Sequence, residues 1–366
     1  MTENQLYTLI FITIVTFFTF TQANRVSRMS NDELLQKNNF SRAIFVLMIF
    51  VVLFMGFRPM TVGGDTGRYW TNFVNMSRGL YTSGEESDWV FYTFQNYCAQ
   101  LMSVSMFFFL VDLIYVGVVF LACKRFTSQN STLMILFAMG AFSFFSYGTN
   151  GLRNGLATSF VVLAIAYIGG DLKDKILCVL LCFLALGCHK STALPVAAMI
   201  FAYFVKWPKG MFYIWVLSIV ASLVAGQAFS NVFMLFDFDD RVAGYVNLDE
   251  SGETEDAIAK AGFRWDFLLY SAMPVILGYY TIVKKRMYDK TFLLLMGTYI
   301  YANAVWVMLI RLPFSNRFAY LSWFLYGIVL AYPLLKFNIW PRQGEKVKLI
   351  MLAHVGFTFF MWYYTL

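Results

Sequence analysis

Residues 176–205 read ILCVLLCFLALGCHKSTALPVAAMIFAYFV, an apolar run that carries His189-Lys190-Ser191 at its middle. An ionisable side chain deep in hydrocarbon costs roughly 2.5–3.5 kcal/mol on insertion scales, unless it faces a cavity or a partner. The chain has only two histidines, and His189 is the one that lies far from a terminus. We therefore predict a chemical site at this break, open toward the outer face of a membrane.

The composition of the whole chain is that of an integral membrane protein. Of 366 residues, 59% are hydrophobic, 19% are aromatic and 13% are charged, and the mean hydropathy is +0.62. Soluble domains carry about twice that share of charged residues. We predict one all-α polytopic domain over residues 1–366, with about twelve segments that cross or half cross the bilayer. The expected segments are 6–23, 41–57, 104–122, 131–147, 152–170, 176–188, 191–205, 211–236, 267–283, 291–310, 318–335 and 349–365.

The positions of lysine and arginine predict the orientation of these segments. Arg25, Arg28, Lys37 and Arg42 follow the first span, which places that loop in the cytoplasm and the N-terminus outside. In this topology lysine dominates the inner loops, whereas the basic residues of the outer loops are nearly all arginine. The planar fork of arginine suits phosphate or carboxylate. The bias indicates an external anionic ligand; the alternative is acid–base pairing within the outer loops.

The outer loop 58–103 begins at Arg58 and contains the sequence GGDTGRY at 63–69. Its glycines allow a tight backbone that can approach a ligand closely. Asp65 and Arg68 either contact substrate, together with Tyr69, or form a bridge within an ordinary turn.

The same loop continues past Asp88 into residues 89–102, where Val90, Phe94 and Tyr97 fall on one helical face. This pattern predicts an interfacial or re-entrant helix.

A second outer loop, 237–266, is acidic and includes Asp239-Asp240-Arg241. Adjacent carboxylates can hold a divalent cation, but such a run is more often a solvated loop. We predict no metal site here, a covering flap over the site, and Arg241 as a substrate contact.

Three shorter outer turns also carry basic residues. Arg153 opens an expected span, where the helix dipole favours anions. Arg311 and Arg317 flank a proline-containing turn, and His189-Lys190 forms the third turn. Each of these residues alone could be an interface anchor that snorkels. We predict instead that they meet in one water-filled pocket.

Four short motifs resemble those of the EpsG/Wzy-type bacterial polysaccharide polymerases. They are Gly64-Asp65-x-x-Arg68-Tyr69, Asp88-Trp89-Val90-Phe91, Arg153-Asn-Gly-Leu-Ala and His189-Lys-Ser. Many relatives carry glutamate at the position of Asp88.

The resemblance implies a glycosyltransferase in the bacterial inner membrane, with its active site toward the periplasm and an architecture like the GT-C membrane glycosyltransferases. We expect it to need no metal and no cofactor. Donor and acceptor would be oligosaccharide repeat units on undecaprenyl pyrophosphate, and a Wzz-type chain-length regulator would be a partner. No nucleic acid is expected. An O-antigen ligase and a flippase or exporter of lipid-linked glycan are the alternatives.

Cleavage of a glycosyl pyrophosphate releases a stable anion, so it needs cationic stabilisation and one base. We predict Arg153, Arg311 and Arg317 as the cations that stabilise the pyrophosphate, without a metal. His189 is the predicted base, with orientation of the acceptor as its alternative role and Asp65 as the rival base. The other expected substrate contacts are Arg58, Arg68, Tyr69, Asp88, Lys190 and Arg241.

Overall fold

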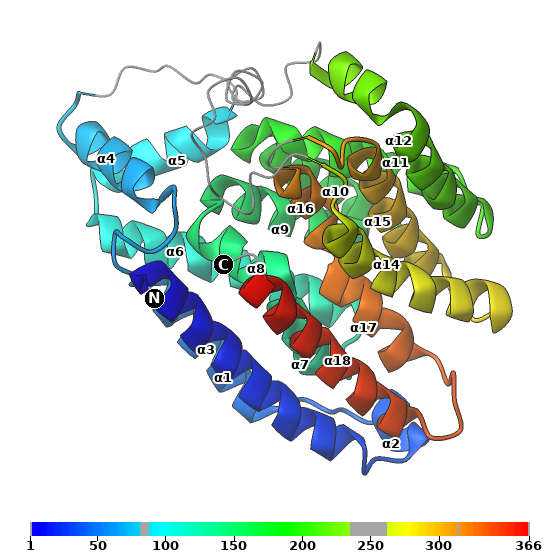
Figure 1. The fold of residues 1–366 in the computed structure, drawn as a ribbon. Coiled ribbons are helices and arrows are strands. Elements are labelled where there is room, and N and C mark those ends of the chain that lie inside the picture. Colours follow the sequence, from blue (N-terminus) through cyan, green and yellow to red (C-terminus); the bar gives the residue numbers. More distant parts are fainter. Residues whose placement is uncertain (1, 81–87, 235–261, 313–314, 365–366) are drawn as a thin grey trace.

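The computed structural model describes residues 2–80, 88–234, 262–312 and 315–364, and every regular element in these ranges is a helix (Figure 1). The elements are α1 (Glu3–Val26), α2 (Asn31–Gln36), α3 (Arg42–Gly56), α4 (Thr66–Ser77), α5 (Trp89–Ala99), α6 (Val104–Phe126), α7 (Ser131–Met139), α8 (Phe142–Thr149), α9 (Leu152–Tyr167), α10 (Leu172–Cys188), the 3-10 turn η2 (Lys190–Thr192), α11 (Ala193–Phe204), α12 (Gly210–Met234), α14 (Trp265–Tyr279), the π-turn η3 (Tyr280–Lys284), α15 (Lys290–Met308), α16 (Asn316–Trp323), α17 (Tyr326–Lys336) and α18 (Gln343–Tyr364).

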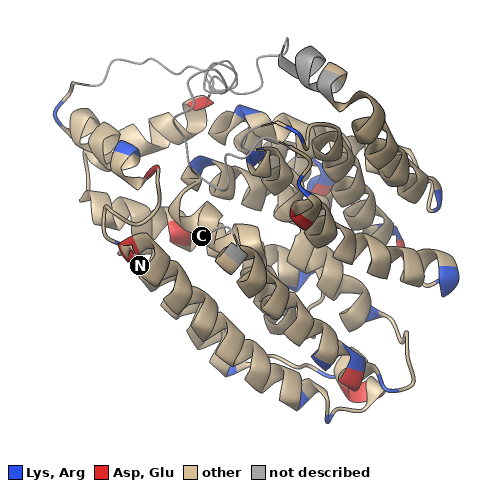
Figure 2. Ribbon diagram, in the orientation of Figure 1, with Lys and Arg blue, Asp and Glu red and all other residues tan. Residues whose placement is uncertain are grey.

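Several of these helices are long and apolar enough to cross a bilayer, so the chain is a polytopic membrane protein. Among the described residues five helices qualify, or six if the bent pair α7–α8 is one span. Charged residues are scarce along the middle of the long helices (Figure 2). Shorter apolar helices, including α3, α9 and α11, lie below the length of about 20 residues that a full crossing needs. The total of twelve segments and the GT-C-like architecture stay predictions.

Most helices pack against two or more other helices. Helix α6 contacts α3 and α9, α9 contacts α10, and α15 lies against both α11 and α12. Helix α1 packs along α18, with the start of α1 near the end of α18 (Figure 1).

The expected span 131–147 is two helices, α7 and α8, that meet at an angle of 77°. Gly140 lies at the bend because α18 approaches its backbone closely. A Cβ atom at Gly140 would lie 3.0 Å from His354 Nε2, and the hydroxyl of Thr358 donates to the Gly140 carbonyl at 2.8 Å. The bend brings the end of α8 and the start of α9 into the interior of the molecule.

The long apolar run is also broken, at the histidine, as the sequence predicts. Helix α10 ends at Cys188, His189 is extended with φ −159°, and η2 follows before α11 begins. Pro195 lies in the first turn of α11, where its missing N–H costs no helical hydrogen bond. The break exposes the His189 side chain at a helix end rather than in a continuous helix.

Helix α5 occupies most of the predicted interfacial segment and turns a polar residue inward. The Gln95 side chain is fully buried and its amide donates to the carbonyl of Tyr69 in α4 at 3.1 Å. Tyr97 and Leu101 are exposed. This packing fixes the start of α5, and with it Asp88, against the body of the protein.

A buried ion pair ties α3 to α6 and removes one predicted substrate contact from the surface. Arg58 Nη1 lies 3.2 Å from Asp112 Oδ2, and both side chains are fully buried. The same guanidinium donates to the carbonyl of Met55 at 2.7 Å and to Thr66 Oγ1 at 3.3 Å, and lies 4.6 Å from the centre of the Phe108 ring. Arg58 therefore stabilises the helix interface and is not among the residues that line the cavity described below.

Replacing Asp112 with asparagine should lower the free energy of unfolding by about 3–5 kcal/mol, because the Arg58 charge would stay buried without its partner. The melting temperature of the purified protein in detergent measures this. Glu33→Gln is the control, because the pair between Glu33 and Lys37 is exposed on both sides and contributes little. Equal melting temperatures for the two variants would contradict the prediction.

Candidate active site

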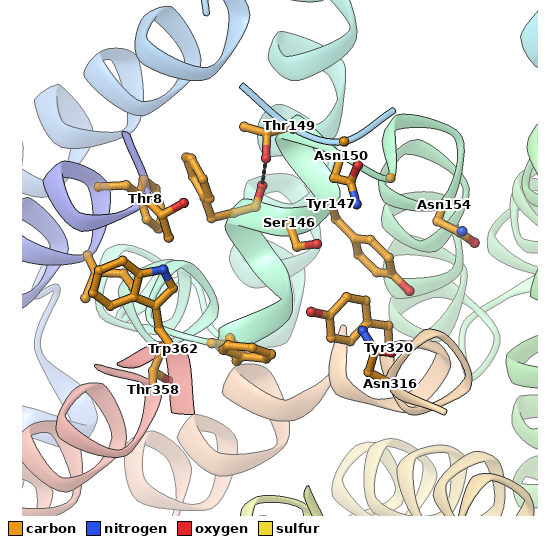
Figure 3. Close-up of a pocket in the computed structure, with 18 of the residues that line it drawn as sticks. Thr8, Ser146, Tyr147, Thr149, Asn150, Asn154, Asn316, Tyr320, Thr358 and Trp362 are labelled. Atoms are coloured by element: carbon orange, nitrogen blue, oxygen red, sulfur yellow. Dashed lines mark hydrogen bonds between the residues drawn. The ribbon is translucent and has the colours of Figure 1, made fainter. Parts of the chain in front are cut away.

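A cavity of about 540 Å³ opens where several helix ends meet (Figure 3). Its wall combines the starts of α1, α9 and α16, the bend between α7 and α8, and the end of α18. Five of the predicted site residues line it: Asp65, Tyr69, Arg153, His189 and Arg317. The structure thus brings together residues as far apart in the chain as Asp65 and Arg317.

Asp88 holds the two most important of these residues in place. Its Oδ2 atom accepts from Arg153 Nη1 at 2.6 Å and lies 2.9 Å from His189 Nδ1. Its Oδ1 atom accepts from the backbone N–H of Lys190 at 3.0 Å. The carboxylate is almost fully buried, with 1% of Asp88 exposed. The starts of α5 and α9 and the end of α10 therefore converge on one carboxylate.

The charge of this carboxylate determines which ring nitrogen of His189 carries a proton. Burial opposes ionisation of Asp88, but the hydrogen bonds and positive charges of His189 and Arg153, with the N–H of Lys190, outweigh it and hold the pKa of Asp88 below its usual range. An ionised carboxylate only accepts hydrogen bonds, so Nδ1 of His189 carries the proton. Nε2 is the nitrogen that is left to accept a proton whenever the imidazole is neutral. This assignment fits a general base whose orientation is set by Asp88.

Arg153 is held at its position by a tyrosine as well as by Asp88. Its Nη1 atom also donates to the hydroxyl of Tyr92 at 2.9 Å, and its guanidinium lies 5.5 Å from the centre of that ring. The residue belongs to the first turn of α9, behind Gly151. Its positive charge and the N-terminal end of the helix dipole both favour an anion in the cavity.

The glycine-containing turn before α4 is seated on the end of α8 and puts Asp65 in the cavity wall. Gly63 has φ +88°, and a Cβ atom there would lie 2.6 Å from the carbonyl oxygen of Thr149. The N–H of Asp65 donates to Asn150 Oδ1 at 2.7 Å. Only glycine allows the turn to approach this closely. Asp65 and His189 line the same cavity, so both stay candidates for the base.

The other predicted contacts lie elsewhere or fall outside the described residues. Arg311 donates to the carbonyl of Ser222 at 3.4 Å and lies over the ring of Phe263, away from the cavity wall. Arg68 is exposed on α4. Arg241 and most of the acidic loop, including both adjacent aspartates, lie outside the described residues.

Several residues in or beside the cavity were not among the predicted substrate contacts. Ser191 Oγ donates to Asn154 Oδ1 at 3.0 Å, which joins η2 to α9. Tyr147 and Tyr320 line the cavity, and Tyr92 contacts Arg153. All three lie in aromatic-rich stretches, where they resemble the interfacial aromatics of any membrane protein. Only the spacing of Tyr92, one helical turn after Asp88, could have indicated that the two residues share a face.

The EpsG family model matches residues 41–366 of this chain. The chain belongs to the EpsG family. No curated protein and no solved structure matches it. The EpsG match includes Asp88, Arg153 and His189, whereas the whole of α1, which lines one side of the cavity, precedes it. Membership of the EpsG family identifies a membrane protein of the polysaccharide polymerase type.

Proposed function

We propose that this EpsG-family protein is a glycosyltransferase that polymerises oligosaccharide repeat units carried on undecaprenyl pyrophosphate. The reaction would occur at the periplasmic face of the bacterial inner membrane. The observation that supports the proposal best is the contact of Asp88 with both His189 and Arg153, which places a proton acceptor and a cation together at one cavity.

In the proposed reaction, a hydroxyl of the incoming lipid-linked repeat attacks the anomeric carbon of the growing chain. A new C–O bond forms as the bond from that carbon to the pyrophosphate oxygen breaks. The electron pair of the broken bond leaves with undecaprenyl pyrophosphate, and the proton of the attacking hydroxyl passes to Nε2 of His189. A single displacement of this kind inverts the configuration at the anomeric carbon.

The arginines stabilise the charge that develops on the leaving group. Pyrophosphate is a stable anion and needs little protonation, so fixed cations suffice. Arg153 and Arg317 line the cavity and supply this charge in the proposal. Asp65 is the alternative base on the same wall.

The opposite part of the cavity suits a lipid-linked substrate. There α1 contributes Phe11, Ile12 and Val15, and α18 contributes Val355 and Trp362. Figure 3 shows Trp362 on the far side of the cavity from Asn154. Binding sites of this kind are mostly apolar with a few placed polar groups, which matches an amphiphile whose head points toward Arg153.

Purified protein in vesicles, supplied with the lipid-linked repeat unit and no nucleotide sugar, tests the proposal. Longer glycans are the expected product. Transbilayer movement of the lipid without new glycosidic bonds would identify an exporter instead, and transfer only to a lipid A core would identify a ligase. A Wzz-type regulator added to the vesicles should change product length and not the linkage.

Arg153→Lys should slow elongation by about 10²–10³-fold, the loss typical of removing one preorganised donor to a developing anion. Lysine keeps the charge, but once its single nitrogen contacts Asp88 and Tyr92, as Nη1 of Arg153 does, no second nitrogen is left to face an anion. Rates of chain elongation measure the effect. The matched control is Arg264→Lys, at an outer arginine that pairs with Asp266 away from the cavity. Full activity of Arg153→Lys would show that Arg153 only anchors the start of α9 and takes no part in the reaction.

A further inference from the structure

One corner of the cavity is built from two tyrosines and an asparagine. Tyr147, at the end of α8, and Tyr320, in α16, meet edge to face with ring centres 5.5 Å apart. Asn316, at the start of α16, completes the corner, and Figure 3 shows the three side chains gathered on one side of the cavity. The hydroxyl of Tyr320 has Ser146 and Asn316 as hydrogen-bonding neighbours.

Two polar atoms of this corner are buried without a hydrogen-bond partner. They are the hydroxyl of Tyr147 and Oδ1 of Asn316, on residues that are 3% and 9% exposed. Buried polar groups in folded proteins are nearly always hydrogen bonded, and an exception calls for a ligand or another explanation. Both residues line the cavity, so a bound molecule can reach them.

The corner adjoins the proposed reaction centre. A Cβ atom on Gly151 would lie 3.2 Å from the ring of Tyr147, so this ring packs against the start of α9. The first turn of α9 carries Arg153 and Asn154, and Asn154 is hydrogen bonded to Ser191, two residues after His189. A group bound in the corner is therefore next to the imidazole and the guanidinium.

The chemistry of the two unpartnered atoms selects the ligand. An amide oxygen only accepts hydrogen bonds, so Asn316 Oδ1 calls for a donor, which a pyrophosphate oxygen is not. A phenol hydroxyl both donates and accepts. Sugar hydroxyls do both as well, and the apolar face of a pyranose ring matches an aromatic surface. A polyprenyl chain would leave both atoms unpartnered.

We infer that the corner of Tyr147, Tyr320 and Asn316 binds the sugar ring next to the bond that is made or broken. This inference rests on the proposed function, because it takes the substrate to be a lipid-linked glycan. The Tyr147 hydroxyl and the Asn316 carbonyl bind hydroxyls of that sugar. The corner thereby selects which repeat unit is elongated.

Tyr147→Phe tests the inference, because it removes only the unpartnered hydroxyl and keeps the ring. Two probes are compared by equilibrium binding to purified protein: the undecaprenyl-pyrophosphate-linked repeat unit, and undecaprenyl pyrophosphate without sugar. We expect about tenfold weaker binding of the first probe, the loss of roughly one hydrogen bond. Binding of the second probe and the melting temperature should not fall. Asn316→Leu should weaken the first probe in the same selective way.

The matched control is Tyr299→Phe. The hydroxyl of Tyr299 donates to the carbonyl of Ser271 at 2.9 Å, outside the cavity. This variant should lower the melting temperature and leave both affinities unchanged.

The outcomes separate the inference from the proposed function. Unchanged binding of both probes to Tyr147→Phe, or an equal loss for both, would overturn the sugar subsite. A selective loss for the glycan-carrying probe would support the subsite even if the wild-type protein never elongated a chain, in which case the proposed polymerase activity would fail alone.

Discussion

Replacing His189 with alanine is expected to slow elongation of the lipid-linked glycan by about 10²–10⁴-fold, the usual contribution of a positioned general base. The chain should still fold and insert, because His189 lies at a helix break and its loss leaves no apolar gap in a helix interface. Product ladders from purified protein in vesicles measure the rate. Near-normal ladders would remove His189 from the mechanism and leave Asp65 as the base.

Two further variants separate proton transfer from the positioning of Asp88. His189→Asn keeps an N–H donor close to the position of Nδ1 but has no group in place of Nε2, so it should retain the melting temperature and lose elongation. His354→Gln is the matched control at the other histidine, which is buried and hydrogen bonded through Nε2 to the carbonyl of Phe137 at 2.9 Å. That variant should keep its elongation rate.

Asp88→Asn is expected to have an effect as large as that of His189→Ala. The carboxylate accepts three hydrogen bonds, from Arg153, from His189 and from the N–H of Lys190. An amide has one oxygen, so its NH₂ group must face a donor on one side. If it faces His189, the imidazole takes the tautomer with the proton on Nε2 and cannot act as a base. We expect a fall in kcat of about 10²–10⁴-fold, by analogy with the triad in which an aspartate orients the histidine.

Comparison with Asp88→Glu shows whether activity depends on the negative charge at position 88 or on the exact positions of its oxygen atoms. Glutamate restores the negative charge and the acceptor oxygens, so this variant should recover much of the activity that asparagine loses. The melting temperatures of both variants should be measured together with the rates, because Arg153 is also held by this carboxylate. Full activity of Asp88→Asn would show that the pairing of Asp88 with His189 has no part in the reaction.

The membrane class and the site at the apolar run could be predicted from sequence because both depend on local chemistry. The bilayer excludes charge from every apolar segment, so His189-Lys190 at the middle of such a run indicates a break whatever the rest of the chain does. The same physics explains why the number of crossings was not determined. A helix of 12 to 17 apolar residues is too short to show, by length alone, whether it spans.

The choice among the outer arginines could not be made from sequence. Arg58 and Arg153 have the same chemistry and the same predicted side of the membrane, yet Arg58 pairs with Asp112 between helices and Arg153 lines the cavity. Which arginine meets which aspartate depends on how α3, α6, α5 and α9 pack, and a single sequence carries no record of those contacts.

The amino-acid sequence by itself therefore determined a polytopic helical membrane protein in which one apolar run is broken at His189. This was possible because the bilayer hydrocarbon excludes charge from each segment independently of the others. Tertiary packing alone decided that Arg153 and His189 share the carboxylate of Asp88, and that Tyr147 and Asn316, each with an unpartnered polar atom, line the same cavity. Hydrogen bonds between residues far apart in the chain exist only where the helices bring their atoms to within about 3 Å.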